Sequence, residues 1–367
     1  MNTIPQTDPK AGYLAQAAEI EAAIRRVLES GWYILGKEVA AFEAEFAAFV
    51  GARHGIGVAN GTDALIVGLR ALGVGPGDGA VTVSHTAVAT VAAIELVGAT
   101  PILVDIDQGY GMDADELAAV LKSAPVPIKA IIPVHLYGQP VALDRIMPLA
   151  ERHGVAVLED CSQAHGATFG AGQVGTFGRL AAYSLYPTKN LGALGDGGVL
   201  VTNDAAIDAS LRALREYGWR ERYISSSTGQ NTRLDEMQAA ILRIKLHDLD
   251  ADNARRRAIA ARYRAGLAGS SLRVLETHAE AEPVYHLFVV ETAQRAGLLA
   301  HLKTQGVLGG IHYALPVHTM DPWRPDTAVA LPNTERACAH VASLPMYPEL
   351  TDAEVDRVIA AVRGFTP

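Results

Sequence analysis

The segment YSLYPTKN, residues 183–190, joins an apolar run to a short turn that carries a lysine. Residues 180–185 have the length and the apolar content of a buried strand. Pro187 and Asn190 then favour a turn, and Lys189 lies between them. A single lysine on a turn is more often a solvated surface residue than a reactive amine. Whether Lys189 is a surface residue or a reactive amine therefore depends on motifs elsewhere in the chain.

Apolar runs and helical patterns alternate on both sides of this segment. Continuous apolar strands that alternate with helices indicate a mostly parallel sheet with helices on both faces. In such sheets, ligands bind beyond the carboxyl ends of the strands. We expect strands at residues 80–84, 101–105, 130–136, 155–159, 180–185 and 199–202, and helices at 37–50, 63–72, 88–97, 113–122 and 143–153, the fourth of them capped by Asp113.

The segment GVAVLEDCSQAH, residues 154–165, places a carboxylate at the end of one of these strands. A carboxylate that binds a pyridine nitrogen keeps the nitrogen protonated, and a protonated ring is an electron sink. Asp160 fits that role, Gln163 can reach the phenolic oxygen of such a ring, and His165 would lie behind it. The alternative interpretation is that Asp160 caps a helix.

Two further segments carry features of a phosphate and ring site. In VANGTDAL, residues 58–65, Gly61 and Thr62 begin an apolar-periodic helix, where free N–H groups and a hydroxyl can face a phosphate. In SHTAVAT, residues 84–90, His85 follows a strand and is expected to stack on a flat ring. Alone, the first would be an ordinary helix cap and the second a packing residue.

The four segments together point to a pyridoxal 5′-phosphate (PLP) site. Lys189 is expected to hold PLP as a Schiff base (aldimine), and to move a proton once the substrate amine displaces it. A nicotinamide site is disfavoured, because the glycines at 192, 195, 197 and 198 precede a strand, whereas a dinucleotide-binding motif follows one. These glycines are instead expected to form tight turns around the lysine.

Composition excludes several classes of protein. The 367 residues carry a formal net charge of −9, which disfavours nucleic-acid binding, and 49% of them are hydrophobic, enough for a sizeable core. Cys161 and Cys338 lack a CxxC spacing, so we expect no disulfide framework, no metal site and a reducing cytoplasmic location. No signal peptide or membrane-spanning segment is expected.

The combination of motifs resembles the DegT/DnrJ/EryC1/StrS family of sugar aminotransferases. The resemblance runs from about residue 31 to 246, through NGTDAL, SHTAVAT, EDCSQAHGA, YSLYPTKNLGALGDGG and GQNTRLDEMQAAILRIKL. It implies the α/β fold type I of PLP-dependent transferases, with a mostly parallel seven-stranded sheet between helices and a smaller C-terminal α/β domain. The expected domains are an N-terminal segment (1–30) that packs with the small domain, a large PLP-binding domain (31–248) and a small domain (249–367).

The resemblance also assigns roles to single residues. Asn231 matches the residue that reaches the phosphate of the neighbouring subunit, which implies a homodimer with shared active sites. The other matches are Gly61, Thr62 and Ser184 for the phosphate, His85 for stacking, Asp160 for the pyridine nitrogen, Gln163 for the phenolic oxygen and Lys189 for the Schiff base.

A finer similarity is to the branch that aminates C3 of dTDP-linked 3-keto-6-deoxyhexoses, through SHTAVATVAAI (84–94), PVHLYGQP (133–140) and YGWRERYIS (217–225). Residues matching Tyr186, His312 and Tyr313 approach the hexose in that branch. Most members have a proline after this tyrosine, whereas this chain has Ala314. The implied reaction transfers the amino group of L-glutamate through pyridoxamine phosphate, making a 3-amino-3,6-dideoxy sugar for a surface glycan such as O-antigen, or another glycoconjugate.

Other activities remain open at this point. One is amination of a 4-keto nucleotide sugar, and another is a PLP-dependent sugar dehydratase. Lys189 argues against the dehydratase, because related dehydratases have histidine at that position. A non-catalytic regulator is disfavoured, since we find no helix-turn-helix and no basic face.

The remaining third of the chain gives fewer signals. Residues 232–249 read as an amphipathic helix that links to a second lobe, with a strand at 285–290 and a closing helix at 352–362. The three arginines at 255–257 are expected on a solvated helical face.

Overall fold

A seven-stranded sheet forms the centre of the large lobe in the computed structural model, which describes residues 2–324 and 329–366. Strand β9 is antiparallel to both of its neighbours, and the other neighbouring pairs are parallel, so the predicted mostly parallel sheet is confirmed. The spatial order is β1 (His54–Val58), β9 (Gly198–Thr202), β8 (Leu180–Ser184), β5 (Ala156–Asp160), β4 (Ile128–Ile131), β2 (Gly79–Val83) and β3 (Thr100–Val104).

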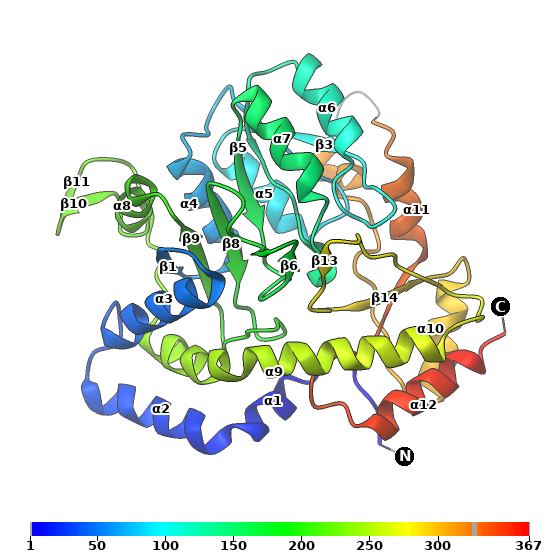
Figure 1. The fold of residues 1–367 in the computed structure, drawn as a ribbon. Coiled ribbons are helices and arrows are strands. Elements are labelled where there is room, and N and C mark those ends of the chain that lie inside the picture. The colour runs from blue at the N-terminus through cyan, green and yellow to red at the C-terminus, as the bar shows by residue number, and fades with distance from the viewer. Residues whose placement is uncertain (1, 325–328, 367) are drawn as a thin grey trace.

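Helices cover both faces of this sheet (Figure 1). Alternate residues of one strand join different cores: Leu180 and Ala182 of β8 pack in one apolar cluster, and Ala181 and Tyr183 in the other. This is the period of two that a strand buried on both faces requires. One cluster includes α4 (Gly61–Ala71), α5 (Val88–Leu96) and α8 (Ala205–Leu214), and the other includes α3 (Lys37–Val50), α6 (Ala114–Ser123) and α7 (Leu143–His153).

Several predicted boundaries agree with the structure. The helices predicted at 37–50 and 143–153 are α3 and α7, and the Asp113 side chain accepts from the N–H groups of Asp115 and Glu116 at the start of α6. Asp113 is therefore the cap that the sequence predicts. The sequence analysis did not identify β1, α8 or the short helices near the N-terminus.

A single helix, α9 (Glu236–Gly266), runs along both lobes (Figure 1). The predicted helix at 232–249 is therefore misplaced at both ends: α9 begins after its cap, Asp235, and continues far beyond residue 249. The boundary predicted between residues 248 and 249 falls inside this continuous helix. The division of the chain into three domains stays a prediction.

The small lobe has its own apolar cluster, built around Tyr263 of α9 and Phe288. Its strand β14 begins at Phe288 rather than at residue 285, because Tyr285 has a positive φ of 44° and interrupts an extended backbone. The closing helix α12 (Asp352–Arg363) is confirmed and carries a capping box between Thr351 and Glu354. The other elements of this lobe are β12 (Arg273–Val274), β14 (Phe288–Glu291), β15 (Val341–Leu344), α10 (Arg295–Thr304) and α11 (Pro332–His340).

The N-terminal segment contacts both lobes. Ile4 is fully buried in the small-lobe cluster and forms a β-bridge with Val307. The segment continues as α1 (Pro9–Ala15) and α2 (Ala17–Ser30), and Ala23 and Val27 of α2 pack against Ala240 of α9.

The prediction of a solvated arginine face on α9 is wrong for Arg256. Its side chain is only 4% exposed, and Nη1 donates to the carbonyl oxygens of Tyr285 (3.3 Å) and Met346 (3.1 Å). The small lobe covers this face of α9, which a charge pattern within one helix cannot indicate.

A hairpin of β10 (Trp219–Glu221) and β11 (Ile224–Ser225) projects from the large lobe beside α8 (Figure 1). A second small sheet joins β6 (Thr168–Phe169) to β7 (Gly172–Gln173) and to β13 (Ala281–Glu282). In the described ranges, we find no helix with the length and hydropathy needed to cross a membrane.

Candidate active site

A cavity of about 560 Å³ lies at the carboxyl ends of β5 and β8. This is the edge of a mostly parallel sheet at which ligands bind. The predicted residues that line the cavity are Gly61, Thr62, Asp160, Gln163, Ser184, Tyr186 and Lys189.

Lys189 lies in the tight turn that follows β8. Its backbone N–H donates to the carbonyl oxygen of Tyr186 (2.8 Å), and a Cβ on Gly192 would lie 2.5 Å from the carbonyl oxygen of Pro187. Glycine is therefore required for this turn, as the sequence predicts for Gly192. Burial lowers the pKa of the Lys189 amine to about 8, and the Asp160 carboxylate opposes this shift. The amine is thus neutral more often than that of a surface lysine, which favours a nucleophile.

Asp160 ends β5 and is only 4% exposed. Its Oδ2 accepts from the Thr90 hydroxyl (2.9 Å), and its Oδ1 accepts from the N–H of Ser162 (3.1 Å). The described chain continues from Asp160 into turns and β6 rather than a helix, so the alternative role as a helix cap is not supported. Two donors orient this carboxylate at the wall of the cavity and leave acceptor capacity for a ligand.

The start of α4 forms an anion-binding corner. Asn60 caps the helix by accepting from the N–H of Asp63 (2.8 Å), which leaves the N–H groups of Gly61 and Thr62 without helical partners. A Cβ on Gly61 would lie 2.6 Å from Cβ of Ser184, so only glycine lets the end of β8 approach the helix this closely. Free N–H groups, two hydroxyls and the positive end of the helix dipole suit a phosphate.

Gln163 has a fixed orientation. Its Oε1 accepts from the backbone N–H of Tyr137 (2.7 Å), and its Nε2 donates to the Tyr313 hydroxyl (3.1 Å). An amide nitrogen carries two hydrogens, so one of them stays available to an oxygen bound in the cavity.

The position predicted for His85 is wrong. The ring is fully buried and does not line the cavity: Nε2 contacts the Tyr137 hydroxyl (2.7 Å) and Nδ1 contacts the Cys338 sulfur (3.1 Å). The chain turns after β2, which leaves His85 behind the cavity wall and brings Ala87 and Thr90 to its surface. Stacking by His85 on a ligand in this cavity is therefore excluded by its position.

Of the three residues predicted to contact a sugar, Tyr186 lines the cavity, and His312 and Tyr313 do not. Tyr186 is 52% exposed. Tyr313 adjoins the cavity through Gln163, and the ring of His312 is held by the Ser343 hydroxyl at 2.8 Å from Nδ1. Burial and the nearby Lys189 ammonium lower the pKa of His312, so this ring is neutral near pH 7.

Asn231 is exposed and does not line the cavity of its own chain. It lies beside the base of the projecting hairpin, in a β-bridge with Glu216. Its predicted contact with a phosphate in a second subunit stays a prediction.

Sequence reasoning missed Thr90 and Tyr137. Thr90 donates to Asp160, and its hydroxyl also lies 3.0 Å from that of Thr86, which precedes α5 by two residues. The signal was present in SHTAVAT as two hydroxyl residues four positions apart. Tyr137 gave no such signal, because its partners come from distant parts of the chain.

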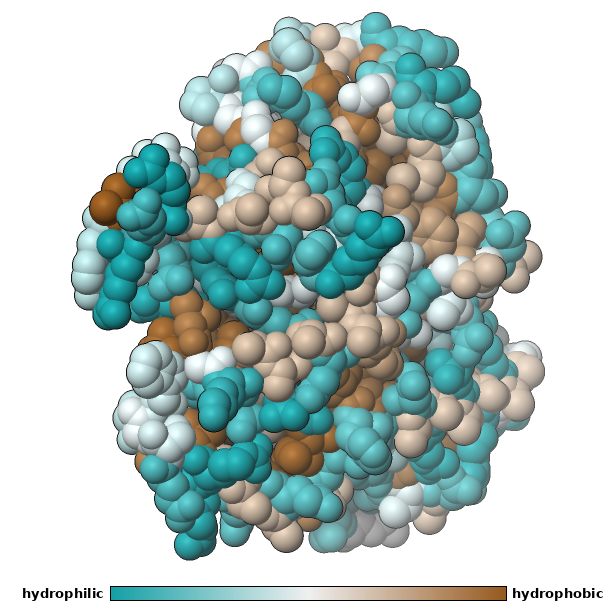
Figure 2. Space-filling model, turned by 60° about the vertical axis from the view of Figure 1, so that its left-hand side comes forward, coloured by the Kyte–Doolittle hydropathy of each residue, from teal (hydrophilic) through white to brown (hydrophobic). Residues whose placement is uncertain are grey.

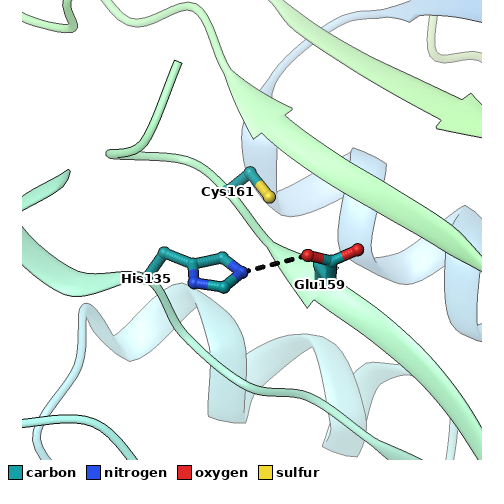
Figure 3. Close-up of side chains that lie close together, drawn as sticks. All are labelled: His135, Glu159 and Cys161. Carbon is teal, nitrogen blue, oxygen red and sulfur yellow. Dashed lines mark hydrogen bonds and ion pairs between the residues drawn. The ribbon is translucent and has the colours of Figure 1, made fainter. Parts of the chain in front are cut away.

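His135, Glu159 and Cys161 form a buried cluster with the spacing of a metal site (Figure 3). Their polar atoms are already used: Oε2 of Glu159 lies 3.2 Å from His135 Nε2 and accepts from the N–H of Gly175, and Oε1 accepts from the N–H groups of Phe177 and Gly178. His135 Nδ1 accepts from Val141, and burial raises the pKa of the Cys161 thiol well above its usual range. This cluster therefore organises the fold rather than binding a metal.

The cavity residues fit PLP. The start of α4 offers a phosphate site, Lys189 offers an amine of lowered pKa, and Asp160 offers a fixed carboxylate with free acceptor capacity. Because Gly61 has no side chain, Ser184 at the end of β8 lies next to the start of α4, where both can contact the same anion.

Comparison with known proteins agrees with this geometry. The DegT/DnrJ/EryC1/StrS aminotransferase family matches residues 15–363. The dTDP-3-amino-3,4,6-trideoxy-alpha-D-glucose transaminase of Streptomyces venezuelae is 44% identical over 99% of this chain and 96% of its own. The UDP-N-acetyl-3-dehydro-alpha-D-glucosamine 3-aminotransferase of Acidithiobacillus ferrooxidans is 40% identical over 98% and 97%. The crystal structure of S. venezuelae DesV in complex with a ketimine intermediate superimposes with a TM-score of 0.96 at 43% identity, covering 99% of this chain and 98% of that one.

Proposed function

The chain belongs to the DegT/DnrJ/EryC1/StrS aminotransferase family, and from this premise we propose that it transfers the amino group of L-glutamate to C3 of a dTDP-linked 3-keto-6-deoxyhexose. As a member of this family it is a PLP-dependent aminotransferase that acts on nucleotide-linked sugars. The product would be a 3-amino-3,6-dideoxy sugar, which suits a surface glycan such as O-antigen or another glycoconjugate.

The observation that supports the site assignments is the meeting of three groups at one cavity: the Lys189 amine, the Asp160 carboxylate and the start of α4. PLP, when bound, supplies an electron sink for the electrons of the C–H bond that breaks. Asp160 would hold the proton on its pyridine nitrogen, and Gly61, Thr62 and Ser184 would bind its phosphate.

Lys189 would hold the cofactor and carry the proton. Its neutral amine takes the proton from the carbon that bears the donor's amino group, and returns a proton in the opposite direction when the keto-sugar is aminated. Glutamate leaves as 2-oxoglutarate in the first half-reaction, and the ketone oxygen of the sugar leaves as water in the second. Tyr186, His312 and Tyr313 would contact the hexose.

Position C3 is supported by the names of two relatives that differ in nucleotide. One is named for a dTDP-3-amino sugar and the other for a UDP-linked 3-dehydro sugar. We favour dTDP because the dTDP relative is the more similar of these two. A 4-keto sugar is the alternative acceptor, and the dehydratase alternative is disfavoured by Lys189.

The proposed homodimer would form at the exposed face around Asn231. The backbone N–H of Tyr217 donates to Gln230, next to Asn231, and the segment that carries Tyr33 bonds to the start of α9 at Glu236. Large apolar and aromatic residues are exposed on both sides of this point. They are Trp32, Tyr33, Ile34, Tyr217, Tyr223 and Ile224. The face that Figure 2 brings forward carries hydrophobic patches, in brown, among hydrophilic side chains. Aromatic residues are enriched at protein interfaces, so these exposed side chains fit a contact with a second subunit.

The substrate assignment is tested by incubating the PLP-loaded enzyme with glutamate and a panel of dTDP-, UDP- and GDP-linked 3-keto and 4-keto sugars. Mass spectrometry detects the amino sugar, and NMR of the product locates the nitrogen. Amination at C3 of a dTDP sugar is the expected outcome. Nitrogen at C4, or no product from any member of the panel, would contradict the proposal, with Lys189→Ala as the inactive control.

The shared site is tested by mixing two inactive variants, Lys189→Ala and Asn231→Ala. In a random mixture half of the dimers are mixed, and each mixed dimer has one intact site if Asn231 acts across the interface, so roughly a quarter of the activity should return. Sites built within one chain would return no activity.

A further inference from the structure

His312 and Tyr313 are each bonded to the large lobe through the same residue, Tyr137. The Tyr137 hydroxyl donates to the carbonyl oxygen of His312, and the Tyr137 backbone N–H orients Gln163, which in turn donates to the Tyr313 hydroxyl. Tyr137 is buried and lies in the short 3₁₀ turn Leu136–Gly138.

One set of hydrogen bonds runs through the Tyr137 hydroxyl, and the other runs through its backbone N–H. In the first set, the donor and the acceptor of each bond follow from the chemistry of its members. A carbonyl oxygen only accepts, so the single hydroxyl hydrogen of Tyr137 points at His312. His85 Nε2, which lies 2.7 Å from the same hydroxyl oxygen, must therefore be the donor in that contact. Burial lowers the pKa of His85 to about 4, so the ring is neutral and carries one N–H.

The tautomer of His85 then assigns the last bond. With the hydrogen on Nε2, Nδ1 is an acceptor, and the Cys338 thiol at 3.1 Å is its donor. The hydrogen bonds run in one direction, from Cys338 in α11 through His85 and Tyr137 to the carbonyl of His312. Each member is almost fully buried except His312, which is half-buried. Aligned hydrogen bonds in a dry environment strengthen one another.

The second set of bonds starts from an uncommon backbone conformation. Tyr137 has a φ of 62°, in the left-handed region that residues other than glycine rarely adopt. In this conformation its N–H lies 2.7 Å from Gln163 Oε1. That contact fixes which end of the amide is oxygen, and Nε2 is then directed at Tyr313 (3.1 Å). A non-glycine residue held at positive φ is a feature that the surrounding structure must stabilise.

We propose that Tyr137 and His85 are positioning residues for the keto-sugar: they fix the His312–Tyr313 segment at the sugar side of the cavity. This inference rests on the proposed function, because it concerns the second half-reaction of that function. Neither residue lines the cavity. Their effect is therefore expected on the fit of the sugar rather than on the proton transfer by Lys189.

The principal test is Tyr137→Phe, which removes the hydroxyl and keeps the ring and the backbone N–H. The keto-sugar KM should rise about tenfold, the effect of losing one buried hydrogen bond and leaving its partner unpaired. The single-turnover rate of the glutamate half-reaction should stay near that of the wild type. In the apoenzyme, amide hydrogen exchange of residues 311–314 should become faster, a readout that does not depend on the cofactor.

Tyr110→Phe is the matched control. Tyr110 is also buried, also has a positive φ (69°), and its ring packs against His85 with a centroid distance of 5.4 Å. Its hydroxyl bonds to Glu291 instead of the His312–Tyr313 segment. This variant should lose stability without a change in the keto-sugar KM or in exchange at 311–314.

Variants of Cys338 and His85, the members farthest from His312 in the first set of hydrogen bonds, provide a second test. Cys338→Ser keeps a donor for His85 Nδ1 and should behave like the wild type, whereas Cys338→Ala should move the keto-sugar KM in the same direction as Tyr137→Phe, by a smaller factor. His85→Ala combined with Tyr137→Phe should be little worse than Tyr137→Phe alone, because the two residues act in series.

Three results would overturn the inference. They are an unchanged keto-sugar KM in Tyr137→Phe, an equal slowing of both half-reactions, and the same change in Tyr110→Phe. Failure of the proposed function is distinguishable, since in that case the wild-type protein itself would not aminate the keto-sugar with glutamate.

Discussion

Glu159 and Asp160 are neighbours on β5, and both are buried, yet they serve opposite faces of the sheet. Glu159 accepts hydrogen bonds from three backbone N–H groups and contacts His135, so its acceptor capacity is filled by the fold (Figure 3). Asp160 accepts from Thr90 and Ser162 and faces the cavity with capacity left over.

The difference teaches how to separate a structural carboxylate from a functional one. Burial alone does not distinguish them, and neither does residue type. The number of hydrogen-bond donors that the protein supplies to each carboxylate does distinguish them. A carboxylate whose acceptor positions are all filled by the protein cannot accept a hydrogen bond from a ligand. The variants below test this contrast.

Lys189→Ala removes the amine that lines the same cavity as Asp160. Transamination should fall by about 10²–10⁴-fold, since the proposed function has this residue carry the proton in both half-reactions. Some PLP should stay bound through the phosphate contacts. In the wild type, borohydride reduction followed by a tryptic map should find the cofactor on Lys189, and recovery on another lysine would contradict the assignment.

Asp160→Asn keeps the shape of the functional carboxylate and removes its charge. A neutral amide cannot hold the proton on the pyridine nitrogen, so kcat should fall on the order of 10²–10³-fold while the protein stays folded. Single-turnover absorbance of the glutamate half-reaction measures this. A normal kcat with PLP bound would show that Asp160 is not the partner of the ring.

Glu159→Gln should have the reverse pattern. Its amide would point an NH₂ group at backbone N–H donors, so the free energy of unfolding should fall by about 2–4 kcal/mol. The folded fraction should retain near-normal kcat. Chemical denaturation measures the first quantity, and loss of kcat without loss of stability would reverse the roles of the two carboxylates.

The smallest effect is on the titration of Lys189 in the apoenzyme. Because the Asp160 charge raises the pKa of this amine, Asp160→Asn should lower that pKa below about 8, whereas Glu159→Gln should leave it unchanged. Acylation rates of Lys189 against pH, read by mass spectrometry, give both values.

The lowered pKa of Lys189 also determines how this residue's contribution to the stability of the apoenzyme changes with pH. Between about pH 8 and the ordinary lysine pKa of 10.5, the unfolded chain binds more protons at this residue than the folded one, so the contribution of Lys189 to stability rises with pH through this window. Below pH 8 the charged amine is buried at a cost.

The sequence predicted the sheet and most of the cavity, because both follow from local patterns. Apolar runs ending in Asp160 and Ser184 place these residues at strand ends, and Gly61 begins a helix that the apolar period marks. Neighbouring positions on one strand have opposite faces, so the assignment of Asp160 rather than Glu159 to the cavity was also accessible.

The errors have a common physical origin. His85 was placed in the cavity because the pattern locates the end of β2 but not the direction in which the chain turns afterwards. Arg256 was assigned to solvent because its cover comes from the small lobe, about 30 and 90 residues further along the chain. Tyr137 was missed because its partners, Gln163 and His312, are also distant in sequence.

The buried position of Ile4 has a consequence for the order of events during translation. Its backbone N–H bonds to Gly306, and its side chain belongs to a core that includes Val307 and residues up to Val362. A ribosome that adds 5–20 residues per second needs roughly 15–70 s to produce these partners after Ile4 has been made. Ile4 therefore waits for partners made long after it, and until then its segment remains accessible to chaperones and proteases.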